Sequence, residues 1–116
     1  MPSRSPLARL SDIIEAIELI NAELDGVTVQ AFEPDRRKRW LVERGIEIIS
    51  EASRRLPDDL KARHPLIPWD KVGAIGNILR HEYERVAHDI LWRLARESLP
   101  NLYAVCCSER EGVMKP

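Results

Sequence analysis

The sequence has few of the residues that cross-link small secreted domains or bind structural metals. Its only cysteines, Cys106 and Cys107, are adjacent, and neighbouring cysteines form a strained disulfide at best. Two ligands alone do not make a zinc site, which takes four. We therefore expect two reduced thiols in a cytoplasmic protein, because disulfides are rare in that compartment.

Long hydrophobic runs are also missing. The N-terminal segment MPSRSPLARL has no extended apolar stretch, and nowhere do about 18 apolar residues follow one another, as a membrane helix requires. We therefore expect neither a signal peptide nor a membrane span. The chain also has no excess of charge of either sign. Its net charge is −1, so any contact with nucleic acid must come from a local basic patch.

The residues that are present indicate a helical protein. With 116 residues, 44% of them hydrophobic and 32% charged, the chain suits one globular domain spanning residues 1–116. Its apolar residues recur at steps of three and four, and no stretch alternates long enough to form a strand. We therefore predict an all-α fold, an antiparallel up-and-down bundle of four to five helices.

Breakers and caps mark the predicted helices. The first helix begins near Pro6 and stops at Gly26, and the second is capped by Asp35 and ended by Pro57. One further turn follows over residues 58–63, a third helix over 69–83, and a fourth begins near residue 87. We expect Pro100 to break or kink the chain before a last short helix. Three tryptophans, Trp40, Trp69 and Trp92, are expected to seal the core.

One stretch, residues 68–93, carries residue types that suggest chemistry. At about 100° per residue, a helical wheel divides it into an apolar arc and a polar arc. The polar arc holds Gly73, Gly76, Asn77, Arg80, His81 and Glu84, with Tyr83 near the seam. The two glycines are expected to form notches on this polar side.

The polar arc offers the groups that metal-independent RNA cleavage needs. His81 can give and take protons near neutral pH, and Arg80 can hold a phosphate through its planar fork. Asn77, one turn before His81, can orient the imidazole or bind a ribose hydroxyl. The alternative is that His81 is a structural hydrogen-bonding residue, as most histidines inside helices are. No metal-ligand spacing and no phosphate-binding glycine loop is present, and we expect no cofactor.

A second basic feature opens the second predicted helix. Arg36, Arg37, Lys38 and Arg39 lie in its first turns, where positive charge opposes the helix dipole. They either form a solvated charged end or contact an RNA backbone. For the second interpretation the candidate residues are Arg36, Arg37 and Arg39.

The segments IPW, Asn-x-x-x-His-x-Tyr (Asn77 to Tyr83) and ILWRLARESLPNL resemble the HepT-like branch of the HEPN superfamily. The segment IEIISEASRRLP, with Ser50-Glu51-Ala52, is similar to that family's second helix. The resemblance runs from about Leu7 to Leu102. It implies a HEPN-like helical bundle that forms a homodimer and sets two copies of the motif helix across a cleft.

The resemblance also implies a function. HepT-like proteins are ribonuclease toxins of two-gene toxin–antitoxin systems, and the partner is a small nucleotidyltransferase antitoxin. In some systems the antitoxin adds AMP to the motif tyrosine, which corresponds to Tyr83. One position departs from the family: the motif arginine is replaced by Gly76. Either Arg80, one turn later, reaches back over the gap that Gly76 leaves, or Arg80 is a surface arginine and the site is degenerate.

Two functions from different classes follow. In the first, the protein is a metal-independent endoribonuclease toxin that uses His81, Arg80 and Asn77, with Tyr83 as a contact or modification site. In the second, it is a catalytically degenerate HEPN module that binds nucleotide or a partner protein without cutting RNA. Dimerisation is expected in both, because a two-fold partner would supply a second histidine and the glycine notches would let helices approach closely.

Overall fold

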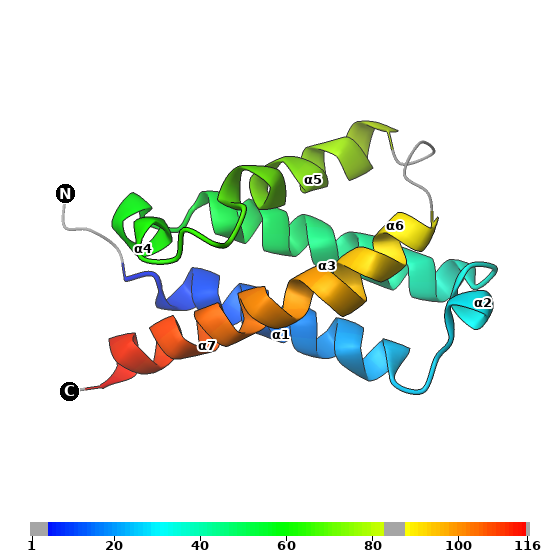
Figure 1. Ribbon diagram of the computed structural model, residues 1–116, viewed down its shortest axis with the longest axis horizontal. Helices are drawn as coiled ribbons and strands as arrows, with labels where there is room; N and C mark the ends of the chain where they lie inside the picture. The colour runs from blue at the N-terminus through cyan, green and yellow to red at the C-terminus, as the bar shows by residue number, and fades with distance from the viewer. Residues whose placement is uncertain (1–4, 83–87, 116) are drawn as a thin grey trace.

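The computed structural model describes residues 5–82 and 88–115 of the chain. The helices are α1 (Leu7–Leu24), α2 (Val29–Phe32), α3 (Arg36–Arg54), α4 (Asp58–Ala62), α5 (Trp69–Glu82), α6 (His88–Arg93), the π-helix η2 (Leu94–Ser98) and α7 (Leu99–Met114). Within those two ranges no residue belongs to a strand. Helices α1, α3, α5 and the run α6–η2–α7 alternate in direction along the long axis (Figure 1). This confirms the predicted all-α, antiparallel up-and-down bundle.

The local signals that begin and end the long helices act as predicted. The Asp35 side chain caps α3 by accepting a hydrogen bond from the backbone N–H of Lys38 at 3.1 Å. Gly26 follows α1 with a φ of 71°, a conformation that costs glycine little because it has no Cβ. The expected connector after Gly26 contains the short helix α2, whose N-cap is Thr28.

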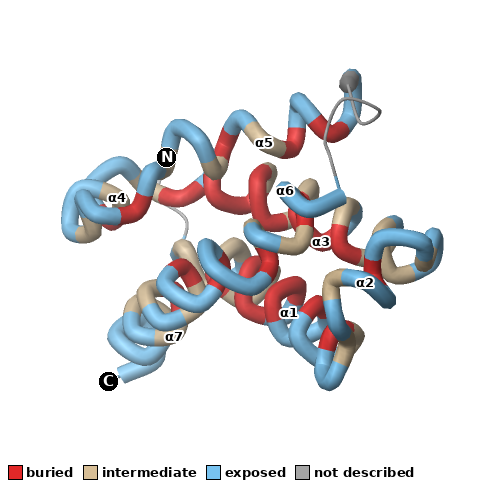
Figure 2. Tube along the Cα trace, turned by 45° about the vertical axis from the view of Figure 1, so that its right-hand side comes forward, coloured by how far each residue is buried: buried red, intermediate tan, exposed pale blue. Residues whose placement is uncertain are grey.

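One continuous core fills the space between the helices. Helix α3 packs against both α1 and α5, and α7 packs against α1, so α3 and α1 carry most of the fully buried surface (Figure 2). Helix α1 presents a stripe of completely buried residues at helical spacing, Leu10, Ile13, Ile14, Ile17, Ile20 and Leu24. Burying each such side chain contributes about 1.5–3 kcal/mol to the stability of the fold. Helices α1 and α3 therefore form the stable core against which α5 packs.

The expectation that three tryptophans seal the core holds for two of them. Trp69 is half-buried, and its indole N–H lies 3.0 Å from the carbonyl oxygen of His64. Trp92 is half-buried against Phe32, with ring centroids 5.4 Å apart. Trp40 contradicts the prediction, because 60% of its surface is exposed. It lies near the start of α3, beside a hollow that it shares with Leu79 and Arg80 of α5.

The C-terminal part of the bundle differs from the prediction. Pro100 lies in the first turn of α7, and the chain does not break there, because the π-helical turn η2 joins α6 to α7 directly. A proline donates no hydrogen bond to the carbonyl four residues earlier. The preceding N–H, of Leu99, bonds five residues back to Leu94, which is π-helical geometry. The predicted short last helix is also wrong, because α7 runs to Met114.

Both cysteines are free thiols, as expected. Cys106 faces the core, and burial raises the pKa of its thiol to about 12. In the part of the chain that the structure describes, no helix is long and apolar enough to cross a membrane.

Candidate active site

The predicted site residues lie on the last turns of α5, on its outer side. Asn77, Arg80 and His81 are all exposed, and Asn77 precedes His81 by four residues, so the two share one face. The imidazole is thus open to solvent and not enclosed by the aliphatic core. Tyr83 and Glu84 lie outside the described residues.

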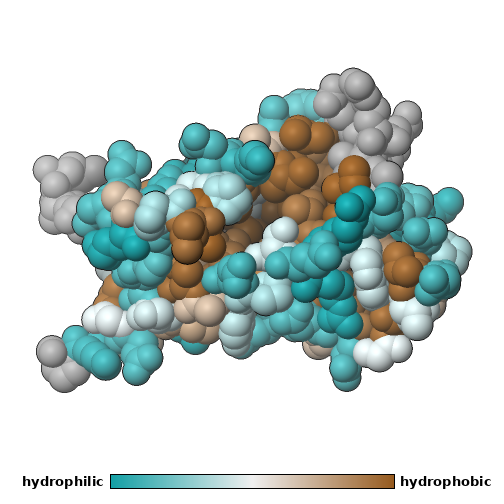
Figure 3. Space-filling model, in the orientation of Figure 1, coloured by the Kyte–Doolittle hydropathy of each residue, from teal (hydrophilic) through white to brown (hydrophobic). Residues whose placement is uncertain are grey.

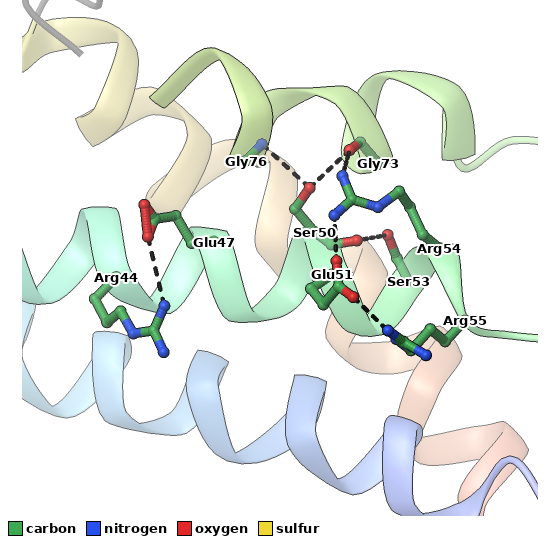
Figure 4. Close-up of polar contacts among 9 residues, drawn as sticks. All are labelled: Arg44, Glu47, Ser50, Glu51, Ser53, Arg54, Arg55, Gly73 and Gly76. Carbon is green, nitrogen blue, oxygen red and sulfur yellow. Dashed lines mark hydrogen bonds and ion pairs between the residues drawn. The ribbon is translucent and has the colours of Figure 1, made fainter. Parts of the chain in front are cut away.

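The two glycines of the motif helix do not face solvent, which corrects the helical-wheel prediction. Gly73 and Gly76 are buried where α5 crosses α3 (Figure 4). A Cβ added to Gly76 would lie 2.7 Å from both Cβ and Oγ of Ser50. The close approach that the glycines permit is therefore between α5 and α3 of one chain, and not between two subunits as predicted.

Ser50 fixes this crossing with two hydrogen bonds to α5. Its buried hydroxyl donates to the carbonyl oxygen of Gly73 at 2.8 Å and accepts from the N–H of Gly76 at 3.1 Å. Arg54 donates to the same Gly73 oxygen at 2.7 Å, and its guanidinium also pairs with Glu51 (Figure 4). Hydrogen bonds from Arg54 and then Arg55 hold the pKa of the Glu51 carboxyl below its usual value. This network sets how α5, and with it His81, lies over α3.

The hypothesis that Arg80 fills a gap left by Gly76 loses its premise, because Ser50 occupies that space. Arg80 instead lines two hollows between α5 and the rest of the bundle. One, of about 390 Å³, is bounded by α1 and α3 and includes Arg9, Arg44 and Glu47. The other, of about 360 Å³, lies closer to the start of α3. Either hollow places the guanidinium beside space that a ligand can enter.

The second hollow contains residues that sequence analysis missed as site candidates. Trp40, Glu43 and Glu47 line it from α3, opposite Leu79 and Arg80 of α5. Their spacing of three and four residues could have predicted this arrangement, because it puts the three side chains on one face of the helix. Burial raises the pKa of the Glu43 carboxyl, and the nearby Arg39 and His88 partly oppose this effect. Among the described residues, no three His, Cys, Asp or Glu side chains are grouped as metal ligands would be.

The basic residues at the start of α3 have different surroundings. Arg36 and Arg37 are exposed, and the Arg36 guanidinium carbon lies 5.9 Å from the Trp40 ring centroid. Arg39 donates to the backbone carbonyl of Glu33 at 2.6 Å, which gives it a structural partner. Lys38 lies 3.2 Å from Glu23 on α1. Of the three predicted RNA-contact residues, Arg36 and Arg37 are therefore the better placed.

Comparison with known proteins identifies the family. The model of the HepT-like ribonucleases matches residues 13–108. A probable ribonuclease HepT of Thermococcus cleftensis is 38% identical over 99 residues, which cover 85% of this chain and 90% of the relative. A putative RNase of Methanocaldococcus jannaschii is 30% identical over 102 residues, covering 88% and 94%. No solved structure matches the chain significantly. The match covers most of the domain and agrees with the helical bundle and with the helix α5 that exposes His81. It shows that the chain belongs to the HepT-like ribonuclease family.

Proposed function

We propose that this protein is a metal-independent endoribonuclease toxin, neutralised in the cytoplasm by a cognate nucleotidyltransferase antitoxin. Family membership supports ribonuclease activity, and the curated relatives are named as ribonucleases. The observation that carries the proposal is the exposure of His81 on the last turn of α5, next to Arg80, which lines two hollows. An exposed imidazole beside a guanidinium can serve both proton transfer and phosphate binding.

The chemistry follows from these groups. His81 accepts the proton of a ribose 2′-hydroxyl, whose oxygen attacks the adjacent phosphorus. The bond from phosphorus to the 5′-oxygen breaks, and a protonated imidazole, from the same or a second copy, gives that oxygen its proton. Arg80 pairs with the phosphate oxygens and stabilises the negative charge that develops on them. Asn77 orients the imidazole or holds the ribose.

A second function, a HEPN module that binds without cutting, is supported by the burial of Gly76. The family's arginine position faces Ser50 at a distance that leaves no room for a side chain. If Arg80 does not replace the missing guanidinium, the site keeps its histidine but loses the charge that stabilises the transition state. Such a protein binds RNA, nucleotide or a partner protein and leaves RNA intact.

The two functions are separated by expressing variants and following growth and RNA integrity. We expect wild-type protein to arrest growth and cut RNA, with purified protein active in EDTA, and His81→Ala to abolish both effects. Arg80→Ala should lower cleavage by at least about tenfold, because one lost transition-state hydrogen-bond donor costs about that or more. Lys71→Ala, which removes another exposed cation of α5, is the matched control. Intact RNA with wild-type protein favours the binding module.

We further propose that the antitoxin acts at Tyr83, by contact or by transfer of AMP to its hydroxyl. The support is the resemblance of the Asn-x-x-x-His-x-Tyr segment to the family motif. Co-expression with a candidate nucleotidyltransferase, if the neighbouring reading frame encodes one, followed by mass spectrometry of the toxin, tests this. The expected result is an added AMP mass on the Tyr83 peptide that Tyr83→Phe removes. Restored growth without modification leaves contact as the mechanism.

We also propose that the protein acts as a homodimer formed across the face between α5 and α6. Apolar side chains gather there on the surface (Figure 3), and Ile78 and Ile90 are 40% and 41% exposed. Exposed apolar patches of this kind commonly mark protein interfaces. Because Ile78 shares the last turns of α5 with His81, a two-fold contact there brings two histidines near one cleft.

A further inference from the structure

The hollow between the start of α3 and the end of α5 has features that phosphate binding by Arg80 does not explain. Trp40, Glu43 and Glu47 form its α3 wall, and Leu79 and Arg80 form its α5 wall. Its volume of about 360 Å³ lies within the range of small-ligand sites. Gly76 of α5 lies against Ser50 of α3, and toward the end of α5 the two helices diverge (Figure 1).

Trp40 is the first unexplained feature. The residue is 60% exposed, although tryptophan is among the side chains that gain most from burial. It makes no part of the core cluster to which Trp69 and Trp92 belong. Arg36 lies over the ring at 5.9 Å, an arrangement that keeps a flat aromatic surface oriented beside positive charge. Proteins that bind single-stranded RNA use such surfaces to stack bases.

The two carboxylates are the second unexplained feature. Glu43 and Glu47 would repel a phosphate, so the hollow is not simply an anion site. Glu43 is half-buried, and Glu47 lies 3.5 Å from Arg44. Carboxylates accept hydrogen bonds from the N–H groups on the edge of a nucleobase. The α3 wall thus combines a stacking surface with acceptors, and Arg80 in the α5 wall supplies the cation that the attached phosphate needs.

We propose that this hollow binds one nucleobase of a single-stranded RNA, next to the phosphate held by Arg80. The base stacks on Trp40, and its Watson–Crick N–H groups donate to Glu43 or Glu47. Guanine suits the site best because it presents two neighbouring N–H groups, whereas uracil presents one between two carbonyls. The proposal rests on the proposed function only in taking Arg80 as the phosphate ligand, and it names the substrate class as single-stranded RNA with a guanine beside the bound phosphate.

The test measures binding separately from cleavage. His81→Ala protein is titrated, by fluorescence anisotropy, into labelled oligouridylates that contain one guanosine or none. We expect the guanosine to strengthen binding. Adding Trp40→Ala should weaken binding of the guanosine oligomer by about tenfold, the usual effect of losing one stacking partner, whereas Trp40→Phe should retain most of it. Glu43→Gln should reduce the preference for guanosine. Leu66→Ala, at a side chain 96% exposed on another surface, is the matched control.

The outcomes distinguish this proposal from the proposed function. If wild-type protein cuts no RNA but Trp40→Ala still weakens binding of the guanosine oligomer, the proposed nucleobase site is supported and the proposed nuclease activity is not. If wild-type protein cuts RNA while folded Trp40→Ala binds both oligomers like its parent, the nucleobase site is overturned. A Trp40→Ala protein that becomes monomeric in sedimentation, while the parent is dimeric, also overturns it, because Trp40 then belongs to a subunit interface.

Discussion

At the scale of single residues, Gly76 and Ser50 show how one missing Cβ sets the position of the motif helix. The Ser50 hydroxyl bridges the Gly73 carbonyl and the Gly76 N–H, and any larger residue at position 76 would overlap it. The same contact leaves no room for an arginine at that position of the motif. Restoring the arginine would require α5 to move away from α3.

Substitution of Gly76 should therefore destabilise the protein. Gly76→Ala places a methyl group 2.7 Å from Ser50, and overpacking of this kind costs about 1–3 kcal/mol. The matched control is Gly112→Ala in α7, where nothing lies within 4 Å of the added Cβ, so that alanine should stabilise the helix by about 0.5–1 kcal/mol. Urea denaturation measures both. Gly76→Arg should be less stable than Gly76→Ala, and a stable, more active Gly76→Arg protein would contradict the packing seen here.

A second residue-scale prediction concerns Glu109 and acid stability. Glu109 of α7 accepts hydrogen bonds from Arg63 at 2.8 Å and pairs with His64 at 2.6 Å. Arg63 first, and then His64, lower the pKa of the Glu109 carboxyl in the folded state. Because its unfolded value is about 4.3, the contribution to stability is present above about pH 5 and is lost as the pH falls through the lower folded value.

Glu109→Gln should accordingly remove about 1 kcal/mol at pH 7, the upper range for partly exposed ion pairs. The loss should shrink below pH 4. Thermal denaturation from pH 7 to pH 3 checks this. Glu111→Gln, at an exposed residue whose partner Lys115 is 3.8 Å away, should change stability little at either pH. Equal losses for Glu109→Gln at both ends of that range would show that the effect is not electrostatic.

At the scale of elements, most helix boundaries could be predicted from the sequence, because helix caps and helix-breaking residues act locally. Asp35, Pro57 and Gly26 each mark an end through their own backbone or side-chain chemistry. What could not be predicted was which face of α5 meets α3. A helical wheel sorts side chains by polarity, and a glycine has no side chain to sort. The Ser50 hydrogen bonds that bury Gly73 and Gly76 are tertiary contacts, which no local pattern reveals.

The cap of α3 gives a prediction at this scale. Four basic residues open the helix and oppose its dipole, so the Asp35 side chain is the main favourable group at that end. Asp35→Ala should lower the free energy of unfolding by about 1 kcal/mol. Asp35→Asn keeps an acceptor for the Lys38 N–H and should lose less, by an amount that falls as salt is added. Urea denaturation at two salt concentrations measures both variants, and identical losses for Ala and Asn would contradict the capping role.

At the scale of the whole molecule, topology was predictable and the surfaces were not. Short connections between amphipathic helices favour an antiparallel bundle, and α1, α3, α5 and α7 form one. Trp40 shows where prediction failed. Its hydrophobicity favoured the core, but in the assembled fold the residue stays 60% exposed on α3. The exposure of the candidate residues Asn77, Arg80 and His81 on α5 could be predicted from their types, whereas the α3 wall of the adjoining hollow could not.

The apolar face between α5 and α6 carries the prediction for assembly. Ile78→Asp should shift the proposed dimer to monomer in light scattering at micromolar concentration, since it places a charge in the interface. Leu66→Asp changes a more exposed leucine on another surface and should leave the mass unchanged. A wild-type protein that is monomeric at this concentration would remove the basis for a cleft with two histidines.

The even number of long antiparallel segments has a practical consequence. Helix α1 begins, and α7 finishes, at the same end of the molecule, whereas α5 finishes and α3 begins toward the other (Figure 1). A fluorescent label or an affinity tag attached after α7 therefore lies at the end of the molecule opposite Trp40, which is near the start of α3. A fusion after α7 should leave the hollow beside Trp40 open, so protein tagged there can serve for the growth and binding assays alike.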